Sequence, residues 1–139
     1  MESIQSGSAE TADYIHKRLQ AYNSRYITDG EELCYFIENE AGACVAGIVA
    51  SRDLDCVTVD YLFVEEAYRK QGYGAKLLAH LEAQAARLSA KRIILNTFGF
   101  QAPAFYEKQG YALFGKLEPC FQEVGQYFFK KELLSPLER

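Results

Sequence analysis

A strand that leads through a glycine-containing turn directly into a helix constrains this chain more than any other feature. Residues 57–64 form an apolar run typical of a buried strand. Residues 72–88 then carry apolar side chains at helical spacing, on a face made of Leu77, Leu78, Leu81, Ala85 and Leu88. A second apolar run at 92–95 predicts another strand. Residues 57–95 should therefore form a parallel, right-handed β–α–β unit.

Further elements are predicted on both sides of this unit. Ser8 suits the N-cap of a helix over 9–26, whose apolar face carries Ile15, Leu19, Tyr22 and Tyr26. Strands are predicted at 33–37 and 43–50, joined by a turn at 39–42. Pro103 suits the first turn of a short helix that stops at Gly110, and strands at 111–116 and 126–131 pair across a loop at 118–125.

This order, α-β-β-β-α-β-α-β-β, predicts an α/β fold with a central mixed sheet covered by helices on both faces. A length of 139 residues with 49% hydrophobic content fits a single domain over residues 1–139. The net charge of −4, without a basic tract, argues against non-specific nucleic-acid binding. No apolar run is long enough to span a membrane, and residues 1–20 lack the layout of a signal peptide. We therefore expect a cytoplasmic protein with neither a membrane nor a nucleic-acid partner.

The four cysteines are scattered and form no Cys-x-x-Cys pair. With only two histidines, neighbouring residues offer no zinc-binding spacing, so no metal site is predicted. Cys34, Cys44 and Cys56 lie in apolar strand-like runs, which favours buried free thiols. A nucleophilic cysteine stays open as an alternative, because nothing nearby singles one out.

The turn before the second helix has the composition of an anion site. Gly72 and Gly74 let the backbone approach a ligand, and the first amides of a helix have no intrahelical partner. These amides and the helix dipole favour a pyrophosphate, and Arg69 and Lys70 add positive charge. The alternative is that the glycines only shape a tight turn, and spacing alone leaves both open.

Two motifs then point to a known family. Arg69-x-x-Gly72-x-Gly74 resembles motif A of the GNAT N-acetyltransferase superfamily, which usually takes the form Gln/Arg-x-x-Gly-x-Gly/Ala. The block from Ala102 to Tyr111 is similar to the motif that follows it in the family, Ala-x-x-x-Tyr-x-x-x-Gly-Phe/Tyr. The resemblance covers roughly residues 33–132. It implies acetyl-coenzyme A (acetyl-CoA) as cosubstrate, bound where the strands of the sheet splay.

The resemblance also implies positions for the cosubstrate. The pyrophosphate should lie on backbone amides of the segment Gln71, Gly72, Tyr73, Gly74 and Ala75, beside Arg69 and Lys70. Phe63 and Val64 should pair with the pantetheine arm. Many relatives hold this arm with an asparagine where the chain has Gly99, so Asn96 or Gln101 is the expected replacement. Phe98 and Phe100 either line an acceptor or acyl pocket or belong to the core.

The chemistry implied is direct attack of an amine on the thioester, without a covalent enzyme intermediate. Tyr106 matches the family's tyrosine, and a phenol can donate a proton to the departing thiolate; packing alone is the alternative role. Alternation along residues 57–64 puts Thr58, Asp60, Leu62 and Val64 on one face, where family members often place a carboxylate base. Asp60 is therefore the candidate base, with His80, Glu38 or water as substitutes.

Three expectations stay open from the sequence. A non-catalytic acyl-CoA sensor or subunit is the alternative to an enzyme, whereas a Rossmann nucleotide domain is disfavoured because the first glycine of Gly-x-Gly-x-x-Gly is missing. The family usually begins with a strand, for which only residues 1–7 are available. The aromatic run 127–129, together with Phe121, favours a homodimer through the C-terminal strand.

Overall fold

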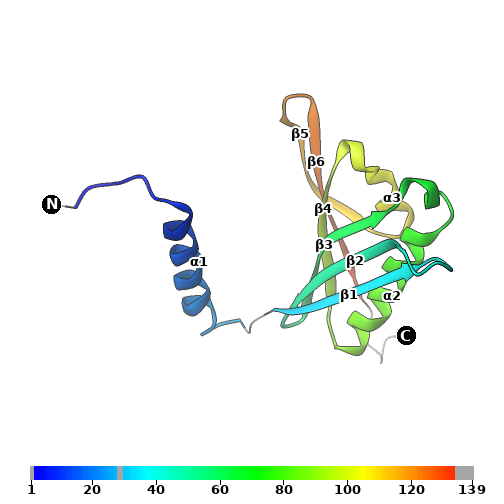
Figure 1. Ribbon diagram of the computed structural model, residues 1–139, viewed down its shortest axis with the longest axis horizontal. Coiled ribbons are helices and arrows are strands. Elements are labelled where there is room, and N and C mark those ends of the chain that lie inside the picture. The colour runs from blue at the N-terminus through cyan, green and yellow to red at the C-terminus, as the bar shows by residue number, and fades with distance from the viewer. Residues whose placement is uncertain (1, 28–29, 134–139) are drawn as a thin grey trace.

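The structure, a computed structural model, describes residues 2–27 and 30–133 (Figure 1). Its helices and strands follow in the order α1 (Ala9–Asn23), β1 (Glu31–Glu38), β2 (Cys44–Asp53), β3 (Cys56–Val64), α2 (Tyr73–Arg87), β4 (Arg92–Phe98), α3 (Pro103–Lys108), β5 (Ala112–Phe121) and β6 (Val124–Glu132). Short 3₁₀ turns at Glu66–Tyr68 and Gly99–Gln101 precede α2 and α3. The expected element order is confirmed.

The strands form one six-stranded mixed sheet in the order β1-β2-β3-β4-β6-β5. All neighbouring strands are antiparallel except β3 and β4, which are parallel, as predicted for a β–α–β unit. The parallel pair is short, because pairing covers only 56–58 of β3 with 92–94 of β4. Since β3 continues to Val64 and β4 to Phe98, the two strands separate beyond their first residues.

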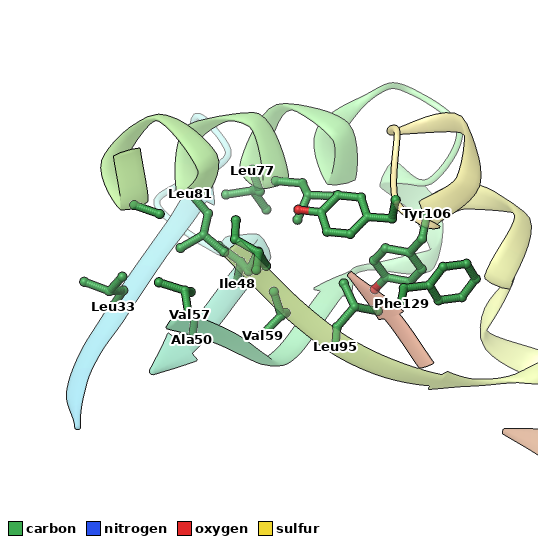
Figure 2. Packing of buried hydrophobic residues seen from close by; sticks show 14 of the residues in the cluster. Leu33, Ile48, Ala50, Val57, Val59, Leu77, Leu81, Leu95, Tyr106 and Phe129 are labelled. Carbon is green, nitrogen blue, oxygen red and sulfur yellow. The ribbon is translucent and has the colours of Figure 1, made fainter. Parts of the chain in front are cut away.

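Helix α2 covers one face of the sheet. Its predicted apolar stripe is buried at Leu77, Leu78, Leu81 and Ala85, against side chains that alternate inwards along the central strands. Figure 2 shows Leu77 and Leu81 pointing from α2 onto Ile48, Ala50 and Val57. Burial of one such side chain stabilises the folded state by roughly 1.5–3 kcal/mol. This layer fixes the start of α2 against the sheet.

Among the described helices, α2 and α3 pack on the same face of the sheet and α1 packs on neither face. This differs from the expected arrangement, in which helices cover both faces. Residues of α2 and α3 belong to the same buried cluster, together with Phe129 of β6. Helix α1 buries no residue and lies apart from the sheet (Figure 1). It begins as predicted because Ser8 caps it: the Thr11 amide donates to Ser8 Oγ, and the Ser8 amide donates to Thr11 Oγ1. It ends at Asn23, three residues before the predicted end.

The other end of the chain differs from its prediction. β5 and β6 form a long hairpin that turns at Gln122 and Glu123, where the sequence predicted a loop over 118–125. β5 is an edge strand of the sheet, and an edge position tolerates Pro119, which cannot donate to a ladder. At the N-terminus, residues 2–7 carry no strand, and Met1 lies outside the described residues.

The cysteines are free, as expected, but the prediction that they are buried is wrong. Cys34 and Cys44 are exposed and Cys56 is only partly buried. Cys34 follows the buried Leu33 on β1 and so points to the opposite face of the strand. Within residues 2–27 and 30–133, no helix has the length and apolar character needed to cross a membrane. The same part of the chain contains no group of three or more His, Cys, Asp or Glu side chains suited to a metal ion.

Candidate active site

The N-terminus of α2 presents unpaired backbone donors. Gly72 is its N-cap, with φ of 87°, and contributes no side-chain cap. The first helical hydrogen bond runs from the Lys76 amide to the Gly72 carbonyl at 3.0 Å. Among the described residues, the amides from Gln71 to Ala75 therefore have no hydrogen-bond partner. A row of free N–H groups at the positive end of a helix is suited to an anion.

The two glycines of the turn have different roles. Gly72 occupies the left-handed region, and a Cβ built on it meets nothing within 4 Å, so open space lies before the amides. Gly74 is different, because a Cβ there would stand 3.3 Å from Phe105 Cζ of α3. The sequence predicted that both glycines let the backbone approach a ligand. For Gly74, the structure shows close packing of α2 against α3 instead.

Arg69 is anchored to the end of β3. Its Nε donates to the Val64 carbonyl at 2.9 Å, and its guanidinium carbon lies 5.7 Å from the centre of the Phe63 ring. One Val64 carbonyl lone pair is therefore already used within the protein. Lys70 is exposed, with φ of 63°, and so extends the left-handed turn at the mouth of the helix. Both cations remain beside the free amides.

Two neighbouring side chains shape the same turn. Gln71 Nε2 donates to the Ala67 carbonyl at 3.2 Å, and the Tyr73 ring packs 6.0 Å from the Tyr68 ring. These contacts hold the turn from within. They leave the backbone amides of the turn free.

The separation of β3 and β4 adds a second recognition element next to the turn. Thr58 and Ile94 are the last residues that pair, so the following backbone of both strands presents free edges. An extended ligand can bind such an edge by the same hydrogen bonds as an added strand. Phe63 and Val64 lie at the end of β3, on this edge and next to the turn. A ligand with an anionic head and an extended polar arm fits the combination.

Tyr106 is held where the two strands diverge. Pro103 begins α3, and Tyr106 is its buried residue, only 8% exposed. Its ring packs 5.8 Å from the Phe129 ring and 6.1 Å from the Tyr111 ring. Figure 2 shows it reaching from α3 towards Phe129 and Leu95. Burial raises the pKa of the Tyr106 phenol, and its hydroxyl has no hydrogen bond within the described residues, so it stays a protonated donor at neutral pH.

Asp60 lies at an irregularity of β3 that the alternation argument missed. Val49 pairs with Tyr61 and Ala50 with Val59, which leaves Asp60 as the extra residue of a β-bulge. Before the bulge, Val57 and Val59 face the core; after it, Leu62 and Val64 do. The prediction that Thr58, Asp60, Leu62 and Val64 share one face is therefore wrong. Asp60 itself is exposed, and within the described part of the chain it makes no ion pair.

The other predicted polar residues are engaged elsewhere. The Asn96 side chain accepts a hydrogen bond from Gln126 Nε2 at 3.2 Å, on the face away from Tyr106. Gln101 Oε1 accepts from the Phe98 amide at 2.9 Å and so closes the turn before α3. His80 packs 4.5 Å from the Tyr35 ring, at the β1 edge, and Glu38 ends β1. The two substitutes for Asp60 therefore lie across β2 and β3 from the strand opening.

Phe98 and Phe100 do not belong to the core. Their rings stack at 5.7 Å, and Phe98 also meets Phe121 of β5 at 5.4 Å. The cluster lies at the end of β4 and is largely exposed, since Phe100 and Phe121 are on the surface. Of the two alternatives that the sequence left open, the core assignment is excluded for Phe100.

The structure adds an acidic groove that the sequence did not indicate. Glu118, Pro119, Gln122, Glu123, Gly125 and Tyr127 line a groove of about 410 Å³ in the β5–β6 hairpin. Tyr127 donates to Glu118 at 2.7 Å, and this hydrogen bond, with the Lys116 charge, lowers the pKa of the Glu118 carboxyl. Glu118 and Glu123 fell in a predicted loop, where no spacing rule brings them to Tyr127. The groove adjoins Gly99, because a Cβ there would lie 3.7 Å from Tyr127.

A second polar group ties α2 to the end of the sheet. Glu82 accepts hydrogen bonds from the Tyr111 hydroxyl and from Lys131 Nζ, both at 2.9 Å. Burial, reinforced by the Glu82 charge, raises the pKa of Tyr111 well above its ordinary value. Because all three groups satisfy one another, their role is structural.

Comparisons with known proteins agree with this geometry. Residues 3–111 match the model of the acetyltransferase (GNAT) family. An acetyltransferase of Agrobacterium fabrum is 32% identical over 113 residues, which cover 80% of this chain and 82% of that protein. A blasticidin-S acetyltransferase of Streptomyces morookaense is 30% identical over 95 residues, 68% of this chain and 70% of the relative.

A solved structure extends the match to the fold. The crystal structure of an acetyltransferase from Bacillus cereus superposes with a TM-score of 0.86 and 33% identity, covering 95% of this chain and 98% of that one. The α2 turn, the strand opening and Tyr106 all lie within residues 3–111, which match the family model. The chain therefore belongs to the GNAT family of acetyltransferases.

Proposed function

We propose that the protein transfers the acetyl group of acetyl-CoA to a primary amine by direct attack. One observation carries the proposal: the free amides of Gln71–Ala75 adjoin the opening between β3 and β4, where Tyr106 is buried. The amides would bind the pyrophosphate, and the free strand edge at Phe63 and Val64 would bind the pantetheine arm. Arg69 and Lys70 would neutralise the remaining phosphate charge.

In the proposed reaction, the amine nitrogen attacks the thioester carbonyl carbon. A C–N bond forms, the C–S bond breaks, and the sulfur leaves with its electron pair. Tyr106 gives its proton to this thiolate, which its buried, protonated phenol supports. The proton lost by the amine goes to Asp60 or to water, and Asp60 is suited to this because its carboxylate is not held in an ion pair in the described structure.

The acidic groove beside Gly99 supports a cationic acceptor. Glu118 and Glu123 provide negative charge next to the end of β4, and the lowered pKa keeps Glu118 ionised. We expect Glu118→Gln to raise KM for the amine more than it lowers kcat, since the groove would bind the acceptor away from the reacting atoms. An unchanged KM for every amine that reacts would remove the groove from the proposal.

The direct test measures CoA release from acetyl-CoA with a panel of amines, including blasticidin S because one relative is named for it. Steady turnover with at least one amine is the expected result. The alternative, a non-catalytic acyl-CoA sensor, predicts binding of acetyl-CoA without turnover for every amine. Calorimetric titration of acetyl-CoA separates this sensor from a protein that does not bind the cosubstrate at all.

Tyr106→Phe tests the donor. Because the ring is kept, packing should survive, while turnover should fall at least about tenfold, as loss of an acid commonly costs roughly 10²–10⁴-fold. Tyr111→Phe is the matched control, because the Tyr111 hydroxyl is bound to Glu82 and should matter for stability only. Equal turnover in the two variants, with chemistry rate-limiting, would leave Tyr106 as a packing residue.

A further inference from the structure

The face of the sheet away from α2 carries an exposed apolar surface. Cross-strand pairing aligns Phe36 of β1, Gly47 of β2 and Phe63 of β3 in one row, and Cys34, Val49 and Tyr61 in the next. Phe36, Tyr61 and Phe63 are 57%, 71% and 53% exposed. Gly47, the middle residue of the first row, has no side chain between the two phenylalanines. We call these six residues the open face.

Soluble proteins rarely leave such a surface uncovered. Three large aromatic side chains on adjacent strands form a contiguous apolar patch, and a patch of this kind marks an interaction site. No other part of the described chain covers it, since α2 and α3 both pack on the opposite side. The open face therefore requires a partner of apolar character.

Helix α1 also has an apolar surface that the other described residues leave uncovered. Ile15, Leu19 and Tyr22 lie along one side of it, at intervals of four and three residues. Tyr26, in the turn after the helix, has its ring 5.8 Å from the Tyr22 ring, and all four side chains are exposed. The opposite side of the helix is polar and carries the Asp13–Lys17 ion pair at 2.9 Å. A helix of 15 residues is marginal alone in water and gains its stability from packing of an apolar face. Helix α1 therefore also requires an apolar partner.

The outlying position of α1 is shared with a crystal structure. Residues 2–27 are about a fifth of this chain. The Bacillus cereus acetyltransferase superposes with a TM-score of 0.86 over 95% of this chain, a score that a superposition without this fifth of the chain could not reach. Part of the first helix therefore superposes together with the sheet, in its outlying position. This favours contact with another molecule over closure on the same chain.

We propose that two copies of this chain form a symmetric dimer in which α1 of each copy packs on the open face of the other. The exchange is reciprocal, as a two-fold axis requires, and satisfies both apolar surfaces with one contact type. It moves the expected homodimer surface from the C-terminal strand to the open face. Phe129 of that strand is buried in the core, and Phe128 packs 6.2 Å from Phe114.

The first test is the mass in solution by light scattering at micromolar concentration. The wild-type protein should have twice the chain mass of 15.7 kDa, whereas Leu19→Asp should have the mass of one chain. Gln20→Asp introduces the same charge on the polar side of α1 and should stay dimeric. A wild-type monomer would overturn the proposal, as would a dimer that Leu19→Asp leaves intact.

Mixing two variants distinguishes exchange from any other dimer. Leu19→Asp damages the helix and keeps the open face, while Phe36→Asp damages the open face and keeps the helix. Each should be monomeric alone. In a mixture, the intact helix of one chain can pack on the intact face of the other, so part of the sample should become dimeric. Contact between two helices or between two sheets predicts no recovery on mixing, and that result would contradict the exchange.

Cys34 gives an independent readout on the open face. Peptide mapping after brief alkylation should show Cys34 protected in the wild type and in Gln20→Asp, but reactive in Leu19→Asp. The exposed Cys120, in β5, serves as the internal reference. Circular dichroism of each variant checks that loss of the dimer does not come from unfolding. Equal Cys34 reactivity in folded wild type and folded Leu19→Asp would overturn the proposed docking place.

Discussion

Helices α1 and α2 have the same length of 15 residues but differ in which part of each helix lacks a partner. Helix α1 closes its N-terminus with the reciprocal hydrogen bonds of Ser8 and Thr11 and leaves its apolar face in solvent. Helix α2 buries its apolar face and leaves its first amides without partners. Helix α1 therefore has a capped N-terminus and an exposed apolar face, whereas α2 has an uncapped N-terminus and a buried apolar face.

This difference locates two distinct kinds of recognition. Unpaired amides are polar and directional, so the end of α2 is suited to an anionic ligand. An exposed apolar stripe is non-directional and gains free energy from burial, so the face of α1 selects another protein surface. Changes at the faces and ends of the two helices should therefore have separable effects.

The largest expected effect is at the face of α2. Leu78→Ala removes a fully buried side chain and should lower the free energy of unfolding by about 2–5 kcal/mol. Leu19→Ala makes the same change on α1, where the side chain is 54% exposed in the single chain. Its effect should vanish on dilution, because it acts through association only. Urea unfolding at two protein concentrations checks both, and a large, concentration-independent cost for Leu19→Ala would contradict the comparison.

The end of α2 should respond through ligand binding. Gly72→Val places a side chain in the open space before the free amides and should lower the affinity for CoA by at least about a hundredfold, or ~2.7 kcal/mol. Gly42→Val is the matched control, since Gly42 also has positive φ and open surroundings but lies in the β1–β2 turn. Both variants carry a backbone strain of roughly 1–2 kcal/mol. Calorimetric titration should show lost binding in the first alone; similar affinity in both would break the assignment.

A smaller effect is expected at the end of α1. Ser8→Ala removes the cap and should destabilise the helix by about 1 kcal/mol. Glu10→Ala, in the first turn but outside the capping bonds, is the control and should cost less. Because α1 forms the proposed dimer contact, the capping change should weaken the dimer without altering CoA affinity. Titration of CoA and sedimentation of the same sample test this separation.

The smallest effect concerns the attachment of α2 to the sheet at high pH. Burial, with the Glu82 charge, holds the folded-state pKa of Tyr111 above the ordinary value of about 10. The stability that this group contributes is therefore fully present below about pH 10 and is lost as the pH rises further. Tyr111→Phe should be less stable at neutral pH and should lose less on going to alkaline pH. If the free energy of unfolding of variant and wild type falls equally with rising pH, Tyr111 does not contribute to the loss of stability at alkaline pH.

Local sequence patterns predicted most of the end of the molecule that we propose to bind the cosubstrate. The glycine turn and the parallel unit at 57–95 depend on residues close together in the chain, and the resemblance to the family singled out Tyr106. Gly72 needs positive φ because the turn reverses direction there, and Pro103 begins α3 because its missing amide is not needed in a first turn. Such rules operate within a few residues, so they can be applied without knowing the tertiary fold.

Three predictions failed where the outcome depended on a neighbour. The bulge at Asp60 exists only in the pairing with β2, so alternation along β3 alone assigned the wrong face. The hairpin at Glu118–Gly125 forms because β5 is an edge strand and accepts Pro119, which the sequence of the loop does not show. Cys34 and Cys44 looked buried because their runs are apolar, yet one face of that sheet region is open.

The sequence by itself determined the order of the helices and strands, which helix begins with amides suited to an anion, and the place of Tyr106 on the short helix that Pro103 begins. Spacing and backbone preference act locally, and these features follow from them. Only the tertiary structure decided that Gly74 makes room for Phe105, that Asp60 lies on a bulge, and that α1 leaves its own sheet. Each of these depends on which distant residues meet, and a period of apolar residues specifies that a surface will be buried but not what will bury it.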